Sequence, residues 1–101
     1  MTYALFDLTG KVAVVVRGTS GIGRAIALGL ADTGAKVIAT GRRIEEVETT
    51  SRAIEERGRR TLRVTSDLAK GDSVGKLLEV CVEVFGKVDI LDQPEFLYHD
   101  E

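Results

Sequence analysis

The feature that most constrains this sequence is a glycine-rich turn placed between an apolar run and a helical pattern. The apolar run spans residues 12–16 (VAVVV), and apolar residues recur at helical spacing from residue 24 to residue 30. The turn between them consists of Gly18, Thr19, Ser20, Gly21, Ile22 and Gly23. Because glycines let the backbone approach a ligand and the first turn of a helix offers unpaired N–H groups, this order predicts a cradle for the phosphates of a dinucleotide.

The rest of the sequence alternates between strand-like and helix-like patterns, which is typical of an α/β protein with a parallel sheet. Strands are expected at residues 12–16, 36–40, 60–65 and 88–91, and helices at 21–33, 44–57 and 72–85. Each helix is followed closely by a glycine suited to a left-handed C-cap, namely Gly34, Gly58 and Gly86. These patterns predict a truncated, Rossmann-like, doubly wound parallel sheet of about four strands in the order 3-2-1-4, with three helices.

Composition indicates one domain without a strong overall charge. The chain has 101 residues, of which 44% are hydrophobic and 30% charged, enough to bury a modest core. We expect a partial dinucleotide-binding domain at 1–91 and a divergent acidic tail at 92–101. A net charge of -2 gives no global attraction for nucleic acid or an anionic membrane. The apolar run at 12–16 is far shorter than the roughly 20 residues of a membrane helix, so we expect a cytoplasmic protein.

The third expected helix has an apolar stripe that is predicted to face the sheet. The stripe contains Val74, Leu77, Leu78, Cys81, Val82 and Phe85. The single cysteine lies within it, so we interpret Cys81 as a core residue rather than a reactive thiol. On the second helix, Glu45 and Glu46 lie in the first turn, where the dipole favours acid, and Glu48 can pair with Arg52; we interpret this as a solvated face.

Residues 6–91 contain a series of short motifs, at 6–12 (FDLTGKV), 19–27 (TSGIGRAIA), 34–38 (GAKVI), 41–43 (GRR), 66–68 (SDL) and 85–91 (FGKVDIL). In sequence and in order, these motifs resemble the amino-terminal, cofactor-binding part of the short-chain dehydrogenases/reductases. The resemblance implies a parent reaction of reversible hydride transfer between NADP and an alcohol or carbonyl. It also implies that the glycine turn holds the cofactor.

The glycine turn departs from the family pattern at two positions. The family places threonine where this chain has Val16, and its first glycine where this chain has Arg17. An unsuitable side chain at that glycine position costs about 1 to 3 kcal/mol in backbone strain. Arg17 either adds a cation beside the cofactor phosphates, or turns to solvent or blocks the pocket.

The catalytic groups of the family have no counterpart in this sequence. After Leu91 the family pattern stops, and the serine, tyrosine and lysine that carry the family's chemistry have no matching positions. Neither Tyr3 nor Tyr98 is followed by a lysine one helical turn later. His99 lies in the acidic tail and is interpreted as solvated, so we predict no catalytic residue and no metal site.

The end of the second strand indicates which cofactor is preferred. NAD is usually held by an acidic residue there, whereas this chain has Arg42 and Arg43. A guanidinium can bind a 2′-phosphate bidentately, so the pattern favours NADP over NAD, with Arg42 as the leading ligand. The alternative is that both arginines are merely exposed residues before a helix. Asp67 and Leu68 complete the predicted site: Asp67 resembles the family residue that bonds the adenine, although it could equally help to end a strand.

Three hypotheses for function follow from the sequence. In the first, the chain is the NADP(H)-binding portion of a short-chain dehydrogenase/reductase and is inactive alone. In the second, it is a non-catalytic product that pairs its exposed sheet edge or open face with another protein chain. In the third, it is a truncated product without function. The expected partners are a dinucleotide cofactor and another protein chain that covers the open sheet edge. Binding to nucleic acid or to a membrane is not expected.

Overall fold

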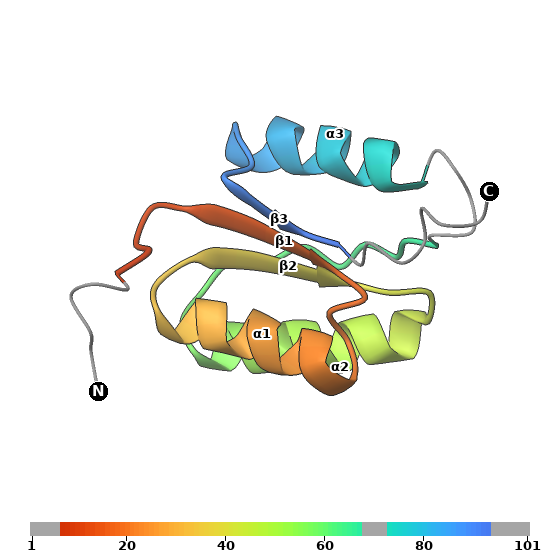
Figure 1. Ribbon diagram of the computed structural model, residues 1–101, viewed down its shortest axis with the longest axis horizontal. Coiled ribbons are helices and arrows are strands. Elements are labelled where there is room, and N and C mark those ends of the chain that lie inside the picture. The colour runs from red at the N-terminus through yellow and green to blue at the C-terminus, as the bar shows by residue number, and fades with distance from the viewer. Residues whose placement is uncertain (1–6, 68–72, 94–101) are drawn as a thin grey trace.

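The fold is a parallel sheet with helices on both faces (Figure 1), as seen in a computed structural model that describes residues 7–67 and 73–93. In this part of the chain the elements are β1 (Val12–Val16), α1 (Gly21–Asp32), β2 (Lys36–Thr40), α2 (Ile44–Glu56), α3 (Ser73–Phe85) and β3 (Ile90–Asp92). The strands are ordered β2-β1-β3, and both pairings are parallel. Helices α1 and α2 cover one face of the sheet, and α3 covers the other (Figure 1). The predicted α/β class and Rossmann-like arrangement are confirmed.

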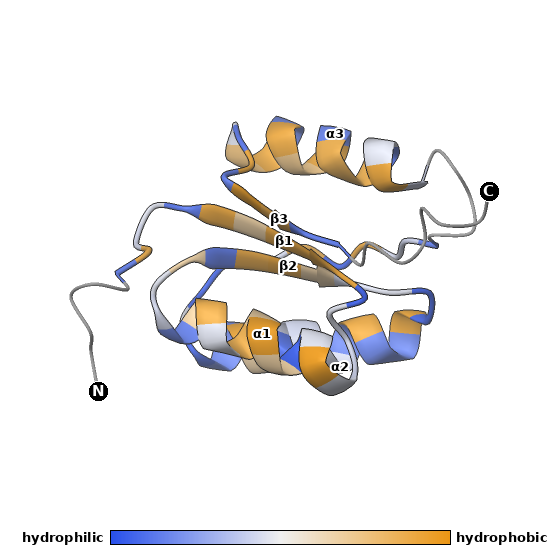
Figure 2. Ribbon diagram, viewed as in Figure 1, coloured by the Kyte–Doolittle hydropathy of each residue, from blue (hydrophilic) through white to orange (hydrophobic). Residues whose placement is uncertain are grey.

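The strand β1 forms the centre of the core because its side chains alternate between the two faces of the sheet. Ala13 and Val15 belong to a buried cluster on the side of α1 and α2, whereas Val12, Val14 and Val16 join a second cluster with residues of α3. All five residues are buried. Figure 2 shows mainly hydrophobic residues along the strands. A continuous apolar run therefore marks a strand that is covered on both faces, as predicted.

The apolar stripe of α3 packs on the sheet, with one exception. Leu77 and Cys81 are buried, and the raised pKa of the Cys81 thiol follows from that burial. Val82 is predicted to share this stripe, but the residue is 47% exposed. The reason is geometric, since Val82 lies about 100° around the helix from Cys81 and so falls at the margin of the contact.

The prediction of a strand at 60–65 is wrong, because this segment forms no regular strand. The segment nevertheless lies where that strand is expected. Residues 59–67 lie beside β2, with hydrogen bonds from Val37 N to Arg60 O at 3.3 Å and from Ser66 N to Gly41 O at 2.8 Å. Between them, the Thr40 hydroxyl donates to the carbonyl of Val64. A side chain thus uses a carbonyl that a backbone ladder would use, and the described residues form three strands instead of four.

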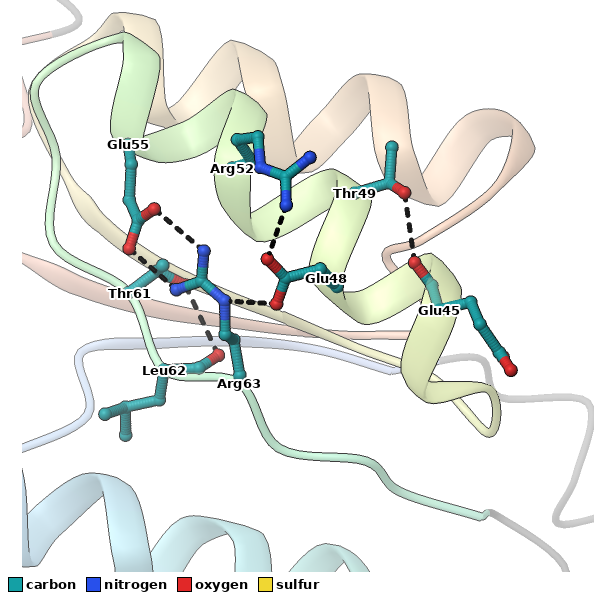
Figure 3. A network of polar contacts seen from close by, with 8 residues as sticks. All are labelled: Glu45, Glu48, Thr49, Arg52, Glu55, Thr61, Leu62 and Arg63. Carbon is teal, nitrogen blue, oxygen red and sulfur yellow. Dashed lines mark hydrogen bonds and ion pairs between the residues drawn. The ribbon is translucent and has the colours of Figure 1, made fainter.

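An ion-pair network fastens this edge segment to α2 (Figure 3). Arg63 donates to both carboxylate oxygens of Glu55, at 2.7 and 2.8 Å, and to Glu48 at 2.6 Å. The predicted pair of Glu48 and Arg52 is confirmed at 2.8 Å. Hydrogen bonds from Arg63 lower the pKa of Glu48 and of Glu55. The resulting stabilisation is therefore present at neutral pH and is lost as the pH falls through the lowered pKa values.

The ends of the elements follow local chemistry. The three glycines predicted to terminate helices have positive φ values of 106°, 80° and 85° at Gly34, Gly58 and Gly86. The strand predicted at 88–91 instead spans Ile90–Asp92. It begins later because the Asp89 carboxylate accepts the Val12 N–H at 2.9 Å, which also lowers the pKa of Asp89. The predicted start of the third helix at Asp72 lies outside the described residues.

Candidate functional site

The glycine turn joins β1 to α1 through a left-handed backbone conformation at Arg17. Among the described residues, Arg17 is the only residue other than glycine with a positive φ, which is 63°. This is the position where the resemblance predicts glycine, so the expected backbone demand is present and an arginine meets it. The turn is also tight. A Cβ on Gly23 would lie 2.1 Å from the Arg17 carbonyl oxygen, so only glycine fits there without movement.

The amino terminus of α1 is open to an anion. Ser20 is the N-cap residue, and its side chain makes no capping hydrogen bond. The first turn of α1 contains no acidic residue, in contrast to α2, which has Glu45 and Glu46 in its first turn. The first N–H groups of a helix lack partners within the helix and carry the positive end of its dipole. This end of α1 can therefore accept negative charge from a ligand.

Hydrogen bonds connect the turn to neighbouring segments along the carboxyl edge of the sheet. Gly18 N donates to the carbonyl oxygen of Thr40 at 3.0 Å, which links the turn to the end of β2. Thr19 lies directly against Gly41, the residue that follows β2, because a Cβ on Gly41 would be 2.6 Å from the Thr19 hydroxyl oxygen. The edge segment joins through Ser66 N, which donates to Gly41 O at 2.8 Å. These bonds hold three segments together at one edge of the sheet.

The arginine pair lies beside this junction. Arg42 and Arg43 follow Gly41 directly, and both are exposed. Arg43 is the N-cap residue of α2, and its NH1 lies 3.9 Å from Glu46 Oε2. Arg42 forms no ion pair with any residue in the described ranges. Because Gly41 contacts Thr19, the backbone that carries these arginines lies next to the glycine turn.

The remaining predicted site residues fall at the same edge or outside the described ranges. Asp67 is half-buried, and its backbone N–H donates to the Ser73 hydroxyl at 2.9 Å, which connects it to the start of α3. Its neighbour Ser66 is buried, and its hydroxyl has no hydrogen-bond partner in the part of the chain that the structure describes. Leu68 lies outside the described residues. The structure thus brings Asp67 to the edge that carries the glycine turn and the arginine pair.

Glu46 is the residue of this region that sequence reasoning missed. It was interpreted as part of a solvated helix face, but its Oε1 accepts a hydrogen bond from the Thr19 hydroxyl at 3.4 Å. The two residues are 27 positions apart. No local pattern predicts such a contact, because it arises from how β2 and α2 are placed beside the turn.

The remaining points concern metal-binding clusters, membrane-spanning helices, and the tyrosines and the histidine near the two ends of the sequence. Within residues 7–67 and 73–93, no three metal-binding side chains come together, and no helix is long and apolar enough to span a bilayer. Tyr3, Tyr98 and His99, for which no catalytic role was predicted, lie outside those ranges.

Comparison with known proteins gives consistent results over most of the chain. A family model described as short chain dehydrogenase matches residues 11–93. The 2-dehydro-3-deoxy-D-gluconate 5-dehydrogenase of Escherichia coli (strain K12) is 42% identical over 91 residues, which make up 90% of this chain and 35% of that protein.

Solved structures are similar over the same region. The L-sorbose reductase of Gluconobacter frateurii, complexed with NADPH and L-sorbose, matches with a TM-score of 0.80 and 37% identity. The match covers 85% of this chain and 33% of the reductase chain. A metagenomic short-chain oxidoreductase in complex with NADP matches with a TM-score of 0.78 and 33% identity, over 84% of this chain and 38% of the oxidoreductase chain. The chain therefore spans about a third of the length of these relatives.

Proposed function

The chain belongs to the short chain dehydrogenase family, and we propose that it is a part of such an enzyme that binds NADP(H) at the glycine turn. The observation that carries the proposal is the juxtaposition of an uncapped helix terminus with an exposed arginine pair at one edge of the sheet. Each of these features alone would be a weak indication. Together they offer N–H donors for a pyrophosphate and guanidinium groups for a 2′-phosphate.

The residues present fit such a ligand in several respects. The N-cap residue of α1, Ser20, makes no side-chain capping hydrogen bond, and the first turn of the helix contains no acid that would repel an anion. Ser66 supplies a buried hydroxyl without a partner among the described residues, which is costly unless a ligand or water meets it. When bound, the cofactor supplies a hydride for reduction of a carbonyl. The role of this chain's own residues is to hold and orient the cofactor.

The preference for NADP depends in this proposal on the arginine pair, with Arg42 as the leading ligand of the 2′-phosphate and Arg43 as the second. Two NADP-containing solved structures lie among the similar chains, which supports NADP without deciding it for this chain. Strand β2 is followed by no carboxylate that would hold the ribose hydroxyls of NAD, since Gly41, Arg42 and Arg43 occupy those positions. The proposed parent reaction is hydride transfer between NADP and an alcohol or carbonyl. The 101 residues contain no match for the family's proton donor, so we propose that they do not turn over alone.

Arg42→Asp should remove the preference for NADPH. The substitution replaces a guanidinium with a carboxylate, and hydrogen bonds to charged groups contribute about 1.5–3 kcal/mol, so NADPH affinity should fall at least about tenfold. NADH affinity should stay within about threefold, because NADH lacks the 2′-phosphate. Isothermal titration calorimetry with both cofactors measures the change.

Lys11→Asp is the matched control, since it makes the same charge change at an exposed residue beside the opposite end of β1. If Arg42→Asp weakened NADPH and NADH binding equally, or if Lys11→Asp weakened NADPH binding as much as Arg42→Asp does, the assignment of Arg42 to the 2′-phosphate would be contradicted.

A second candidate function is binding of another protein chain. It is favoured by the outer edge of β3, which pairs with no strand in the described part of the chain. Leu91 on that strand is 44% exposed, and Val80, Val82 and Val84 on α3 are 37%, 47% and 44% exposed. Unpaired edges and neighbouring apolar side chains are typical of contact surfaces. A non-catalytic chain of this kind needs no cofactor, so the titration above separates the two candidates.

A further inference from the structure

Glu46 lies between the two halves of the proposed cofactor site. It occupies the first turn of α2, and its side chain is 44% exposed. One carboxylate oxygen accepts from the Thr19 hydroxyl of the glycine turn at 3.4 Å. The other lies 3.9 Å from NH1 of Arg43. A single negative charge therefore lies beside both the turn and Arg43, one member of the arginine pair.

Neither contact is strong enough to make Glu46 a structural clamp. A hydroxyl-to-carboxylate distance of 3.4 Å is long for a hydrogen bond of this type. The pair with Arg43 is separated by 3.9 Å and is exposed on both sides, and such surface pairs contribute little to stability. What Glu46 chiefly brings to this place is its charge.

We propose that Glu46 is a specificity-determining residue that weakens the preference for NADP over NAD. The inference rests on the proposed function. A phosphate bound by Arg43 would lie near the Glu46 carboxylate, because that carboxylate is already 3.9 Å from the guanidinium. The carboxylate repels the phosphate and competes with it for Arg43. NADH carries no 2′-phosphate, so the same charge affects its binding much less.

The test compares Glu46→Gln with Glu45→Gln in the 101-residue chain. Glutamine keeps the size of the side chain and an oxygen that can accept from Thr19, but removes the charge. Glu45 is the matched control because it lies in the same first turn of α2 and is exposed, so its substitution removes an equal charge and an equal dipole interaction. NADPH and NADH are titrated into each variant by calorimetry at about 50 mM and about 500 mM NaCl.

We expect Glu46→Gln to raise NADPH affinity roughly three- to tenfold at low salt, since a phosphate group carries close to two charges. NADH affinity should change less than about twofold, and the gain for NADPH should shrink at high salt. Glu45→Gln should change neither affinity by more than about twofold.

Several other results would overturn the inference. A fall in NADPH affinity would mean that Glu46 positions Arg43 for binding instead of competing for it. An equal gain for both cofactors, or an equal effect of the Glu45 control, would mean that the charge acts without specificity. Absence of binding of either cofactor to the unsubstituted chain would overturn the proposed function together with the inference. NADPH binding with an unchanged preference in Glu46→Gln would overturn the inference alone.

Discussion

Arg17→Gly should both stabilise the chain and strengthen NADPH binding by about tenfold. Arg17 has a φ of 63°, in the left-handed region that costs a residue with a Cβ about 1–2 kcal/mol. Glycine removes this strain, although it also adds freedom to the unfolded chain, so a net gain of about 0.5–1 kcal/mol is expected. Without a Cβ at this position, the backbone of the turn can also approach a bound phosphate more closely. Thermal unfolding and calorimetric titration measure the two effects.

Arg17→Ala is the control that separates backbone strain from charge. Alanine removes the guanidinium but keeps a Cβ at the same φ, so neither the stability nor the affinity should rise as in Arg17→Gly. The competing hypothesis, that Arg17 binds a phosphate, predicts a loss of affinity in both variants and a shallower dependence on salt. A loss of that kind would show that Arg17 is a ligand.

Gly23→Ala should have the opposite effect on the same turn. Its Cβ would lie 2.1 Å from the Arg17 carbonyl oxygen, so the backbone of the turn must move. We expect a destabilisation of about 1–3 kcal/mol, as for other overpacked positions, and at least a tenfold loss of NADPH affinity, because about 1.4 kcal/mol corresponds to tenfold. Chemical denaturation and the cofactor titration provide the two values.

Gly29→Ala is the matched control for this substitution. Gly29 lies on the same helix, α1, and a Cβ there would meet nothing within 4 Å. Alanine should therefore stabilise the helix by up to about 1 kcal/mol and leave cofactor affinity unchanged. If Gly23→Ala behaved like Gly29→Ala, the close approach inside the turn would not matter for the fold or for binding.

Features set by short stretches of sequence could be predicted. The five apolar residues of β1 predict a strand buried on both faces, and β1 has that environment. The glycines after the three helices predict left-handed caps, which they form. Cys81 was correctly assigned to the core because its place in the apolar stripe of α3 is a local property.

Features that depend on contacts between distant segments could not be predicted. The segment at 60–65 has a strand-like pattern, but the Thr40 side chain and the Arg63 ion pairs determine how it lies against β2 and α2. The late start of β3 depends on the Asp89 carboxylate, which is 77 residues from its partner Val12. The contact between Thr19 and Glu46 is of the same kind. Sequence spacing therefore identified the glycine turn but not the acidic residue beside it.

The most direct test of a dinucleotide site at this edge is amide chemical-shift mapping of the ¹⁵N-labelled chain during titration with NADPH. We expect the largest shift changes at the turn and the arginine pair, namely Gly18, Ser20, Gly21, Gly23, Arg42 and Arg43. Exposed positions of α3, such as Val80 and Glu83, should change little, because they lie on the other face of the sheet. Shift changes confined to α3 and β3, or none at saturating NADPH, would contradict a cofactor site at the glycine turn.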